Sequence, residues 1–288
     1  MAERKRMRRI AVIGSGTMGN GIAHVAALSG LEVVLYDIAE DALARSTANI
    51  ARNMERQLRS GRLDANEKAI ALSRVRTTMD LAQAVSNAEL AVEAAPEDAS
   101  LKYRLLTELD RLAPSGAILA SNTSSVSITK MGARTARPDR VIGMHFMNPV
   151  PVMRLVEVVR GLRTSDETVR TVVELATRLG KTPVEVNDFP GFVSNRILMP
   201  MINEAIFALT EGVAEAEAID AVMRMGMNHP MGPLALADLI GLDTCLGILE
   251  VLHRELGDDR YRPAPLLRKY VAAGWLGRKS GRGFHSHE

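Results

Sequence analysis

Two titratable residues, His145 and Glu157, have the types and positions that suit proton transfer. His145 comes near the end of a strand expected over residues 141–146, where a histidine faces either a ligand crevice or the core. Glu157 stands inside the apolar run 155–159, where burying an unpaired carboxylate would cost several kcal/mol. The turn at residues 148–151 carries the chain back, so His145 is the expected partner of Glu157. Such a pair indicates general acid–base chemistry.

The carboxylate has an alternative explanation. Arg154 and Arg160 flank the same apolar run, and either could hold Glu157 in a structural ion pair. That arrangement would leave His145 without an orienting acid.

Two further polar features could serve a ligand. The loop Ser-Asn-Thr-Ser-Ser at residues 121–125 follows a strand expected over 117–120, and ligands of parallel sheets lie at the carboxyl ends of strands. Its alternative is a helix cap, because Ser, Thr and Asn all satisfy free N–H groups. Asn195 lies on the apolar face of a helix expected over 192–211, where its amide either caps the helix start or reaches into a crevice between domains.

A glycine-rich turn joins the first apolar run of the chain to an amphipathic segment. Gly14 lets the backbone turn, Gly16 leaves room for a pyrophosphate, and Gly19 allows the helix to lie close on the strand. The helix N-terminus then presents free N–H groups to phosphate. A second apolar run, residues 32–36, ends at Asp37, where a ribose diol is usually held. Together these features predict a dinucleotide site rather than an ordinary glycine-rich turn.

The acid at the end of the second run also selects the dinucleotide. A carboxylate at Asp37 hydrogen-bonds a 2′-hydroxyl and repels a 2′-phosphate. Residues 38–41 are Ile, Ala, Glu and Asp, which supply no adjacent cation. We therefore expect NAD rather than NADP.

Four arginines share one face of the long helix expected over residues 40–59. They are Arg45, Arg52, Arg56 and Arg59. This basic face is either a solvated surface, paired in part with acids such as Glu55, or a landing surface for an anionic substrate.

The elements that must position these groups fall into two parts. Segments typical of strands and helices alternate up to residue 188, which predicts an α/β domain with a doubly wound, mostly parallel sheet of the Rossmann type over residues 1–188. Beyond it, residues 189–288 are expected to form an all-helical domain. Its helices are expected over residues 192–211, 216–225, 234–256 and 266–273. Their apolar faces must be buried on one another or on a second subunit, which favours a homodimer.

Composition narrows the class of protein. The net charge is +2, with 36 basic and 34 acidic residues, so no overall field marks a nucleic-acid binder. The basic cluster at residues 4–9 is expected to be a solvated tail. No segment approaches the roughly 18 uninterrupted apolar residues of a membrane span. Cys245 is the single cysteine of the chain, which fits a reducing compartment, and we expect a cytoplasmic protein.

Two other patterns receive a structural interpretation. Four methionines are expected to pack in a core, although methionine also lines adaptable acyl pockets. They are Met223, Met225, Met227 and Met231. The pair His285 and His287 resembles a metal motif only superficially, and a frayed polar end is expected there. We expect no metal site.

Several longer motifs resemble a known family. They are GSGTMG, SNTSS, GMHFMNPVPVMRLVEVV, DFPGFVSNRI, NHPMGPLALADLIGLDT and GRKSGRGF. With them the chain resembles the short-chain L-3-hydroxyacyl-CoA dehydrogenases, most closely the bacterial 3-hydroxybutyryl-CoA dehydrogenases. The likeness runs over almost the whole chain after the basic tail.

The resemblance implies a role for each matching residue. It makes His145 the catalytic base and Glu157 its orienting acid, while Ser124 and Asn195 hold the substrate. The cofactor residues that it implies are Gly14, Gly16, Thr17, Met18, Gly19, Asp37, Glu97, Lys102, Ser124 and Asn148. For the phosphates of coenzyme A, Arg56 matches a basic position, whereas Ser60 stands where related enzymes often carry lysine. Arg59 or Arg62 is the expected substitute.

The implied reaction is hydride transfer between NAD and C3 of a short-chain hydroxyacyl-CoA thioester, with His145 exchanging the hydroxyl proton. Two other functions stay open. A dehydrogenase of free 3-hydroxy acids would typically use a lysine on the first interdomain helix, and residues 192–211 contain none. A non-catalytic NAD-binding protein would have no need of a paired base.

Overall fold

The computed structural model describes residues 7–287 of the chain. Arg4, Lys5 and Arg6 of the basic cluster therefore lie outside the described residues. The chain separates into two compact units, Met1–Asp188 and Phe189–Glu288. No helix in residues 7–287 is both long enough and apolar enough to cross a membrane.

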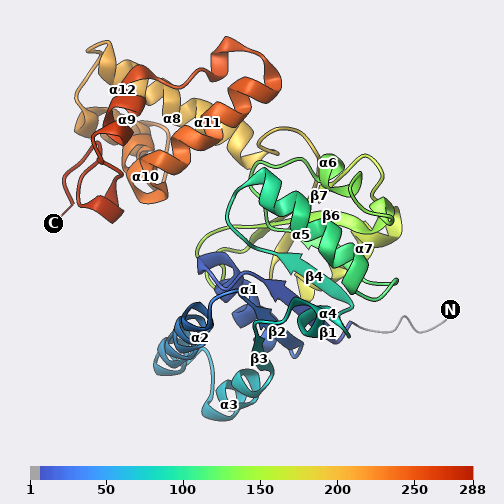
Figure 1. Ribbon diagram of the computed structural model, residues 1–288. Coiled ribbons are helices and arrows are strands. Elements are labelled where there is room, and N and C mark those ends of the chain that lie inside the picture. Colours follow the sequence, from blue (N-terminus) through green and yellow to red (C-terminus); the bar gives the residue numbers. More distant parts are fainter. Residues whose placement is uncertain (1–6, 288) are drawn as a thin grey trace. The chain divides into compact units, whose positions relative to one another are not determined.

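The first unit is built on an eight-stranded sheet (Figure 1). The strand order is β3-β2-β1-β4-β5-β6-β7-β8, and every neighbouring pair is parallel except β6 and β7. The strands are β1 (Arg9–Ile13), β2 (Glu32–Tyr36), β3 (Val75–Thr78), β4 (Leu90–Glu93), β5 (Ile118–Ser121), β6 (Val141–Phe146), β7 (Leu155–Arg160) and β8 (Thr182–Asn187). The predicted doubly wound, mostly parallel sheet is confirmed.

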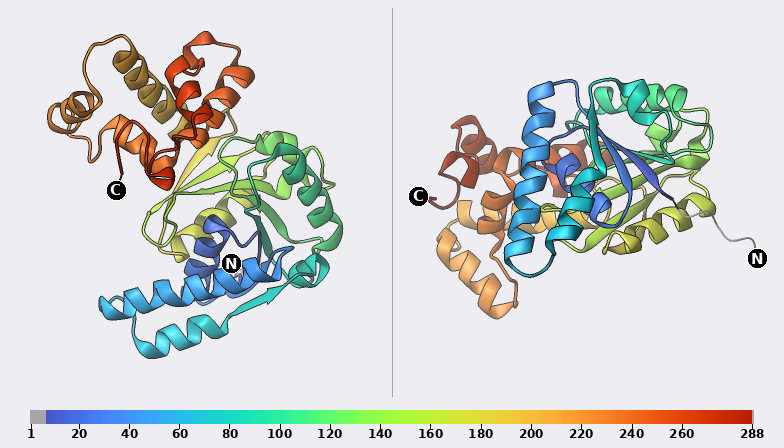
Figure 2. Two further views of the ribbon diagram at one scale, coloured as in Figure 1. Left: turned by 60° about the vertical axis from the view of Figure 1, so that its left-hand side comes forward. Right: turned by 90° about the horizontal axis from the view of Figure 1, so that it is seen from below.

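Helices cover both faces of this sheet (Figure 2). Side chains of α1 and α7 join one hydrophobic core on the same face, and α4, α5 and α6 contact one another in sequence. The helices of the first unit are α1 (Thr17–Leu28), α2 (Glu40–Arg59), α3 (Ala65–Ser73), α4 (Leu81–Val85), α5 (Ala99–Leu112), α6 (Ile128–Gly132), η1 (Pro138–Arg140) and α7 (Asp166–Arg178).

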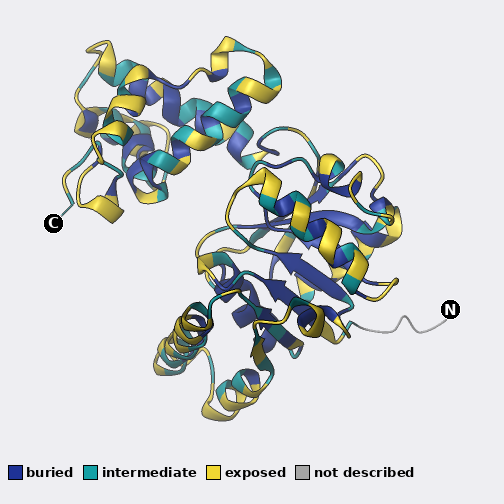
Figure 3. Ribbon diagram, viewed as in Figure 1, coloured by how far each residue is buried: buried dark blue, intermediate teal, exposed yellow. Residues whose placement is uncertain are grey.

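The central strands are mostly apolar because both of their faces are covered. Every residue of β4, β5 and β6 is buried, as the dark ribbons of Figure 3 show. Only a few polar residues occur in these strands, and they lie near the carboxyl ends. Those polar residues build the candidate site.

The second unit contains the helices α8 (Ser194–Thr210), α9 (Ala216–Gly226), α10 (Pro233–Ile240), α11 (Leu242–Leu256), η2 (Asp259–Tyr261), α12 (Pro265–Ala272) and η3 (Arg278–Ser280). Their apolar faces form a core of their own, and the predicted helical domain is confirmed. The single helix expected over 234–256 is wrong. Gly241 has a φ of 104°, which ends α10 and lets α11 start in a new direction.

Two other expectations about this unit are corrected. Met225 is 77% exposed and Met227 is 59% exposed, so this part of the methionine stretch does not pack in a core. The frayed end is also wrong. His285 Nε2 lies 2.7 Å from Asp220 Oδ2, and His287 Nε2 lies 2.9 Å from Asp238 Oδ2. These bonds tie the terminal segment to α9 and α10. The partners lie far apart in the sequence, so no local pattern indicates the contacts.

Candidate functional site

The glycine turn between β1 and α1 has the geometry of a phosphate cradle. Gly14 has a φ of 105°, a conformation that favours glycine. A Cβ on Gly19 would lie 1.8 Å from the Gly14 carbonyl oxygen, so the close approach of helix and strand requires glycine there. Gly16 caps α1 without a side-chain hydrogen bond, and a Cβ there would meet nothing within 4 Å. The space beside Gly16, at the N-terminus of α1, is therefore open for a phosphate.

Asp37 lies directly after β2, beside this turn. Its Oδ2 accepts hydrogen bonds from Ser15 N at 2.8 Å and Ser15 Oγ at 2.7 Å, and its Oδ1 accepts one from Ala39 N at 3.2 Å. A cavity of about 650 Å³ runs over the turn, and its lining includes Gly14, Gly16, Asp37, Ile38 and Arg45. The open helix N-terminus, the missing Cβ atoms and the fixed carboxylate fit a dinucleotide with an unmodified ribose.

His145 and Glu157 meet across the antiparallel pair β6–β7. The two residues are direct register partners, so their side chains lie on the same face. His145 Nδ1 is 2.7 Å from Glu157 Oε2, and the residues are 6% and 2% exposed. A neutral imidazole beside an ionised carboxylate would donate from Nδ1, which would leave Nε2 as the acceptor. The alternative partner Arg160 instead binds Asp166 and Glu185.

Ser124 lies on the other side of the imidazole. Its Oγ is 3.1 Å from His145 Nε2. The loop that carries it is gathered by one carboxylate oxygen, Glu97 Oε1, which accepts hydrogen bonds from Ser124 N and Ser125 N at 2.9 Å each. The same oxygen accepts the hydroxyl groups of Thr123 and Ser125. Partial desolvation acts to raise the pKa of Glu97, but the Lys102 ammonium and these hydrogen bonds outweigh it and hold the pKa below its usual value, while the side chain stays 40% exposed.

Lys102 is bonded within the protein, and its implied contact with the cofactor stays a prediction. Its side chain is 1% exposed, and its Nζ donates to Glu93 Oε1 at 2.8 Å, Glu93 Oε2 at 3.0 Å and the Ala95 carbonyl at 3.1 Å. The ammonium thus lies behind the loop, bonded to the protein itself. Glu93 was not singled out from the sequence, although an acid that ends the buried strand Leu-Ala-Val-Glu is a signal of the kind that marked Glu157.

The remaining predicted residues are placed as follows. Asn148 is exposed in the turn after β6. Asn195 is buried in the first turn of α8, in the second unit, and its predicted role stays a prediction. On α2, Arg56 is exposed and Arg59 donates to Glu55 at 3.2 Å, and both interpretations of the basic face stay open.

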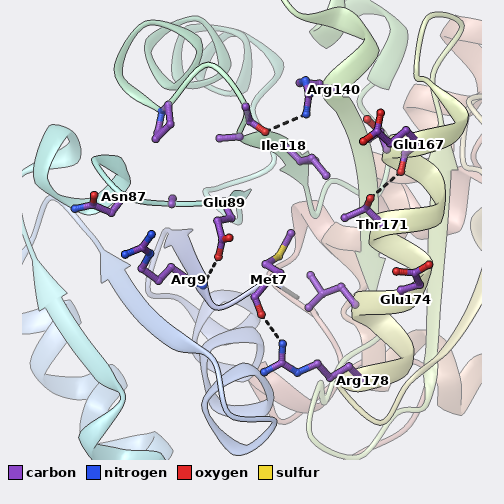
Figure 4. A pocket seen from close by; sticks show the side chains of 16 residues that line it. Met7, Arg9, Asn87, Glu89, Ile118, Arg140, Glu167, Thr171, Glu174 and Arg178 are labelled. Atoms are coloured by element: carbon purple, nitrogen blue, oxygen red, sulfur yellow. Dashed lines mark hydrogen bonds between the residues drawn. The ribbon is translucent and has the colours of Figure 1, made fainter. Parts of the chain in front are cut away.

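A second cavity, of about 840 Å³, opens at the opposite edge of the sheet, where β1 and β5 begin (Figure 4). Its charged lining residues are Arg9, Arg140, Arg178, Glu89, Glu167 and Glu174. Arg140 donates to the Gly116 carbonyl, Arg178 donates to the Met7 carbonyl, and Glu89 accepts the N–H of Arg9. Doubly wound sheets bind ligands at the carboxyl edge, so the smaller cavity is the candidate cofactor site. Within residues 7–287, no three His, Cys, Asp or Glu side chains form a group that could hold a metal.

The chain is similar to known proteins over almost its whole length. The family model for the NAD-binding domain of 3-hydroxyacyl-CoA dehydrogenase matches residues 9–189, and that for the C-terminal domain matches residues 191–287. A probable 3-hydroxybutyryl-CoA dehydrogenase of Bacillus subtilis is 56% identical over 282 residues, which cover 98% of each chain. A 3-hydroxybutyryl-CoA dehydrogenase of Bradyrhizobium diazoefficiens is 51% identical over 98% of this chain and 96% of its own. The crystal structure of the (S)-3-hydroxybutyryl-CoA dehydrogenase of Ralstonia eutropha superposes with a TM-score of 0.94 at 50% identity, covering 98% of this chain and 99% of that one.

Proposed function

The chain belongs to the 3-hydroxyacyl-CoA dehydrogenase family, and on that premise we propose that its substrate is a short-chain 3-hydroxyacyl-CoA, the four-carbon 3-hydroxybutyryl thioester. The enzyme is an NAD-dependent oxidoreductase of this family. The proposal is carried by one observation: the imidazole of His145 is held between the Ser124 hydroxyl and the Glu157 carboxylate.

His145 exchanges the proton of the reacting hydroxyl group. Its Nε2, which faces Ser124 Oγ, takes the proton from the C3 hydroxyl when the thioester is oxidised. In the reverse direction the imidazolium returns that proton to the ketone oxygen. The cofactor, when bound, would supply the hydride chemistry, with NAD⁺ as the acceptor in the oxidation and NADH as the donor in the reverse direction.

Glu157 and Ser124 prepare the imidazole for this exchange. The carboxylate holds the proton on Nδ1, which keeps the lone pair on Nε2, and it stabilises the cation that forms. The Ser124 hydroxyl fixes the reacting oxygen within hydrogen-bond distance of Nε2. We assign Asn195 to the same substrate, and Arg56 and Arg59 to the phosphates of coenzyme A.

Asp37 and the glycine turn support the choice of NAD over NADP. The carboxylate is fixed by Ser15 and Ala39 where a 2′-phosphate would add a second negative charge. Glu97 and Asn148 are assigned to the nicotinamide half of the cofactor. A homodimer and a cytoplasmic location stay predictions.

The direct test is a spectrophotometric assay of NADH consumption with acetoacetyl-CoA and a panel of 3-ketoacyl-CoA thioesters of four to sixteen carbons. We expect turnover with NADH, weaker turnover with NADPH, and the highest kcat/KM at four carbons. Turnover of free acetoacetate in place of the thioester would favour a free-acid dehydrogenase. No turnover with either cofactor at any chain length would favour a non-catalytic NAD-binding protein.

A further inference from the structure

A buried ion pair lies behind the Ser124 loop. Glu93 is 0% exposed and Lys102 is 1% exposed, and they belong to β4 and to the first turn of α5. In addition to the bonds from Lys102, the Glu93 carboxylate accepts hydrogen bonds from the N–H of Ala95 at 2.7 Å and from the Ser121 hydroxyl at 2.5 Å. With this many donors around it, the carboxylate is fixed in position.

Two connections run from this pair to Ser124. Lys102 Nζ lies 3.3 Å from Glu97 Oε2, and the other oxygen of Glu97 binds the N–H groups of Ser124 and Ser125. Glu93 is the register partner of Ser121 across β4 and β5, and Ser121 Oγ in turn accepts the N–H of Thr123. Both connections end on the backbone beside the hydroxyl that contacts His145 Nε2.

The chemistry of the pair suits positioning better than stabilisation. Taking two charges out of water offsets most of their attraction, so a buried pair is weak evidence for stability. The pair instead fixes the position of Glu97, because the Lys102 ammonium is itself held in one place and binds the Glu97 carboxylate. Since catalysis depends on atoms held within near-attack distance, a small displacement of the Ser124 loop would be costly.

We propose that Glu93 and Lys102 are positioning residues for Ser124: they hold Glu97 and Ser121, and through them the loop that aims the Ser124 hydroxyl at His145. The inference rests on the proposed role of Ser124. It assigns Glu93 a part in the reaction and gives Lys102 support of the loop in addition to its predicted cofactor contact.

The test is a double-mutant cycle between the pair and Ser124. The variant Glu93→Gln/Lys102→Met removes both charges together, which avoids leaving one buried and unpaired. We expect kcat with acetoacetyl-CoA, measured at saturating NADH, to fall about ten- to hundredfold. In a Ser124→Ala background the same pair of substitutions should cause little further loss, because the hydroxyl it positions is already gone.

The matched control is a second largely buried ion pair, whose acidic member also lies on α5. Asp110 on α5 binds Arg137 at 2.7 Å, with side chains 14% and 15% exposed. Asp110→Asn/Arg137→Met should leave kcat within about twofold of the parent and should combine additively with Ser124→Ala, as distant sites do.

A second measurement does not depend on turnover. Hydrogen exchange of the segment 122–126 reports the N–H groups that Glu97 binds, and we expect faster exchange there in the Glu93→Gln/Lys102→Met variant but not in the control. Unchanged exchange, or fully additive losses in the cycle, would overturn the inference. If the parent enzyme turned over no acyl-CoA thioester, the proposed function would fail, and the exchange measurement would still decide whether the pair holds the loop.

Discussion

Two parts of the sheet's carboxyl edge are built in different ways. The cofactor half, residues 14–37, takes its groups from one continuous stretch, and most of them are backbone N–H groups and missing Cβ atoms. The half that we propose transfers the proton, the proton-transfer half, takes side chains from three separate segments: Ser124, His145 and Glu157. A site built from backbone is sensitive to added atoms, and a site built from side chains is sensitive to removed charges and hydroxyls.

The largest effect is expected from removing one charge in the proton-transfer half. Glu157→Gln keeps an oxygen that can accept from Nδ1 but loses the negative charge, so both the tautomer and the cation lose support. We expect kcat to fall by about a hundredfold, within the range of acid–base substitutions. NADH affinity, measured by fluorescence titration, should stay within about threefold of the parent, because the cofactor half is untouched.

Glu185→Gln is the matched control for this prediction. Glu185 lies on the neighbouring strand β8 and binds Arg160 at 2.7 Å near the surface. It should leave kcat almost unchanged. A similar loss of kcat in both variants would mean that any disturbance of β7 and β8 lowers the rate, and that the acid beside His145 has no special role.

Adding one methyl group to the glycine turn should weaken the binding of NADH. Gly19→Ala places a Cβ against the Gly14 carbonyl oxygen, so the turn must shift, and we expect NADH affinity to fall at least about tenfold together with a lower Tm. Gly16→Ala meets no protein atom within 4 Å, so it should lower NADH affinity while leaving Tm nearly unchanged. Equal effects of the two variants on Tm would contradict this description of the turn.

A smaller change is expected from the carboxylate of the cofactor half. Asp37→Asn removes the charge that repels a 2′-phosphate, so the ratio of kcat/KM for NADH over NADPH should fall by about tenfold. The same assay with acetoacetyl-CoA measures both cofactors. An unchanged ratio would mean that other groups discriminate between them.

The smallest effect concerns stability and not catalysis. His24 on α1 is fully buried, and burial lowers its pKa from the ordinary 6.5, with Lys181 adding to the effect and the Gln57 hydrogen bond opposing it. The unfolded chain therefore binds a proton at a pH where the folded chain does not. The contribution of neutral His24 is complete above pH 6.5 and is lost as the pH falls below it. Urea unfolding between pH 5 and 8 should show a shallower decline for His24→Gln than for the parent, and parallel curves would contradict this.

The cofactor half could be predicted from the sequence because its signals are local. Gly14, Gly16, Gly19 and Asp37 lie on adjacent elements, and their spacing alone implies strand, turn and helix. The pairing of His145 with Glu157 was also predictable, because a carboxylate inside an apolar run needs a partner. Their direct opposition followed from an antiparallel register that no local pattern states.

Long-range contacts explain what the sequence did not reveal. Glu93 and Lys102 meet only because α5 packs back over the end of β4, and Ser121 joins them through the pairing of β4 with β5. His285 is held by an acid on α9 far back in the chain. Gly241 was read as part of one long helix because the apolar pattern continues on both sides of it.

The central claim is that His145 exchanges the proton of the reacting oxygen, and one comparison tests it most directly. Turnover of acetoacetyl-CoA and NADH binding are measured for the parent, for His145→Gln and for His253→Gln, whose imidazole binds Asp259 at the surface of the second unit. The account predicts a fall in kcat of at least about a hundredfold for His145→Gln, with NADH binding retained and His253→Gln unaffected. Near-normal turnover of His145→Gln would contradict it.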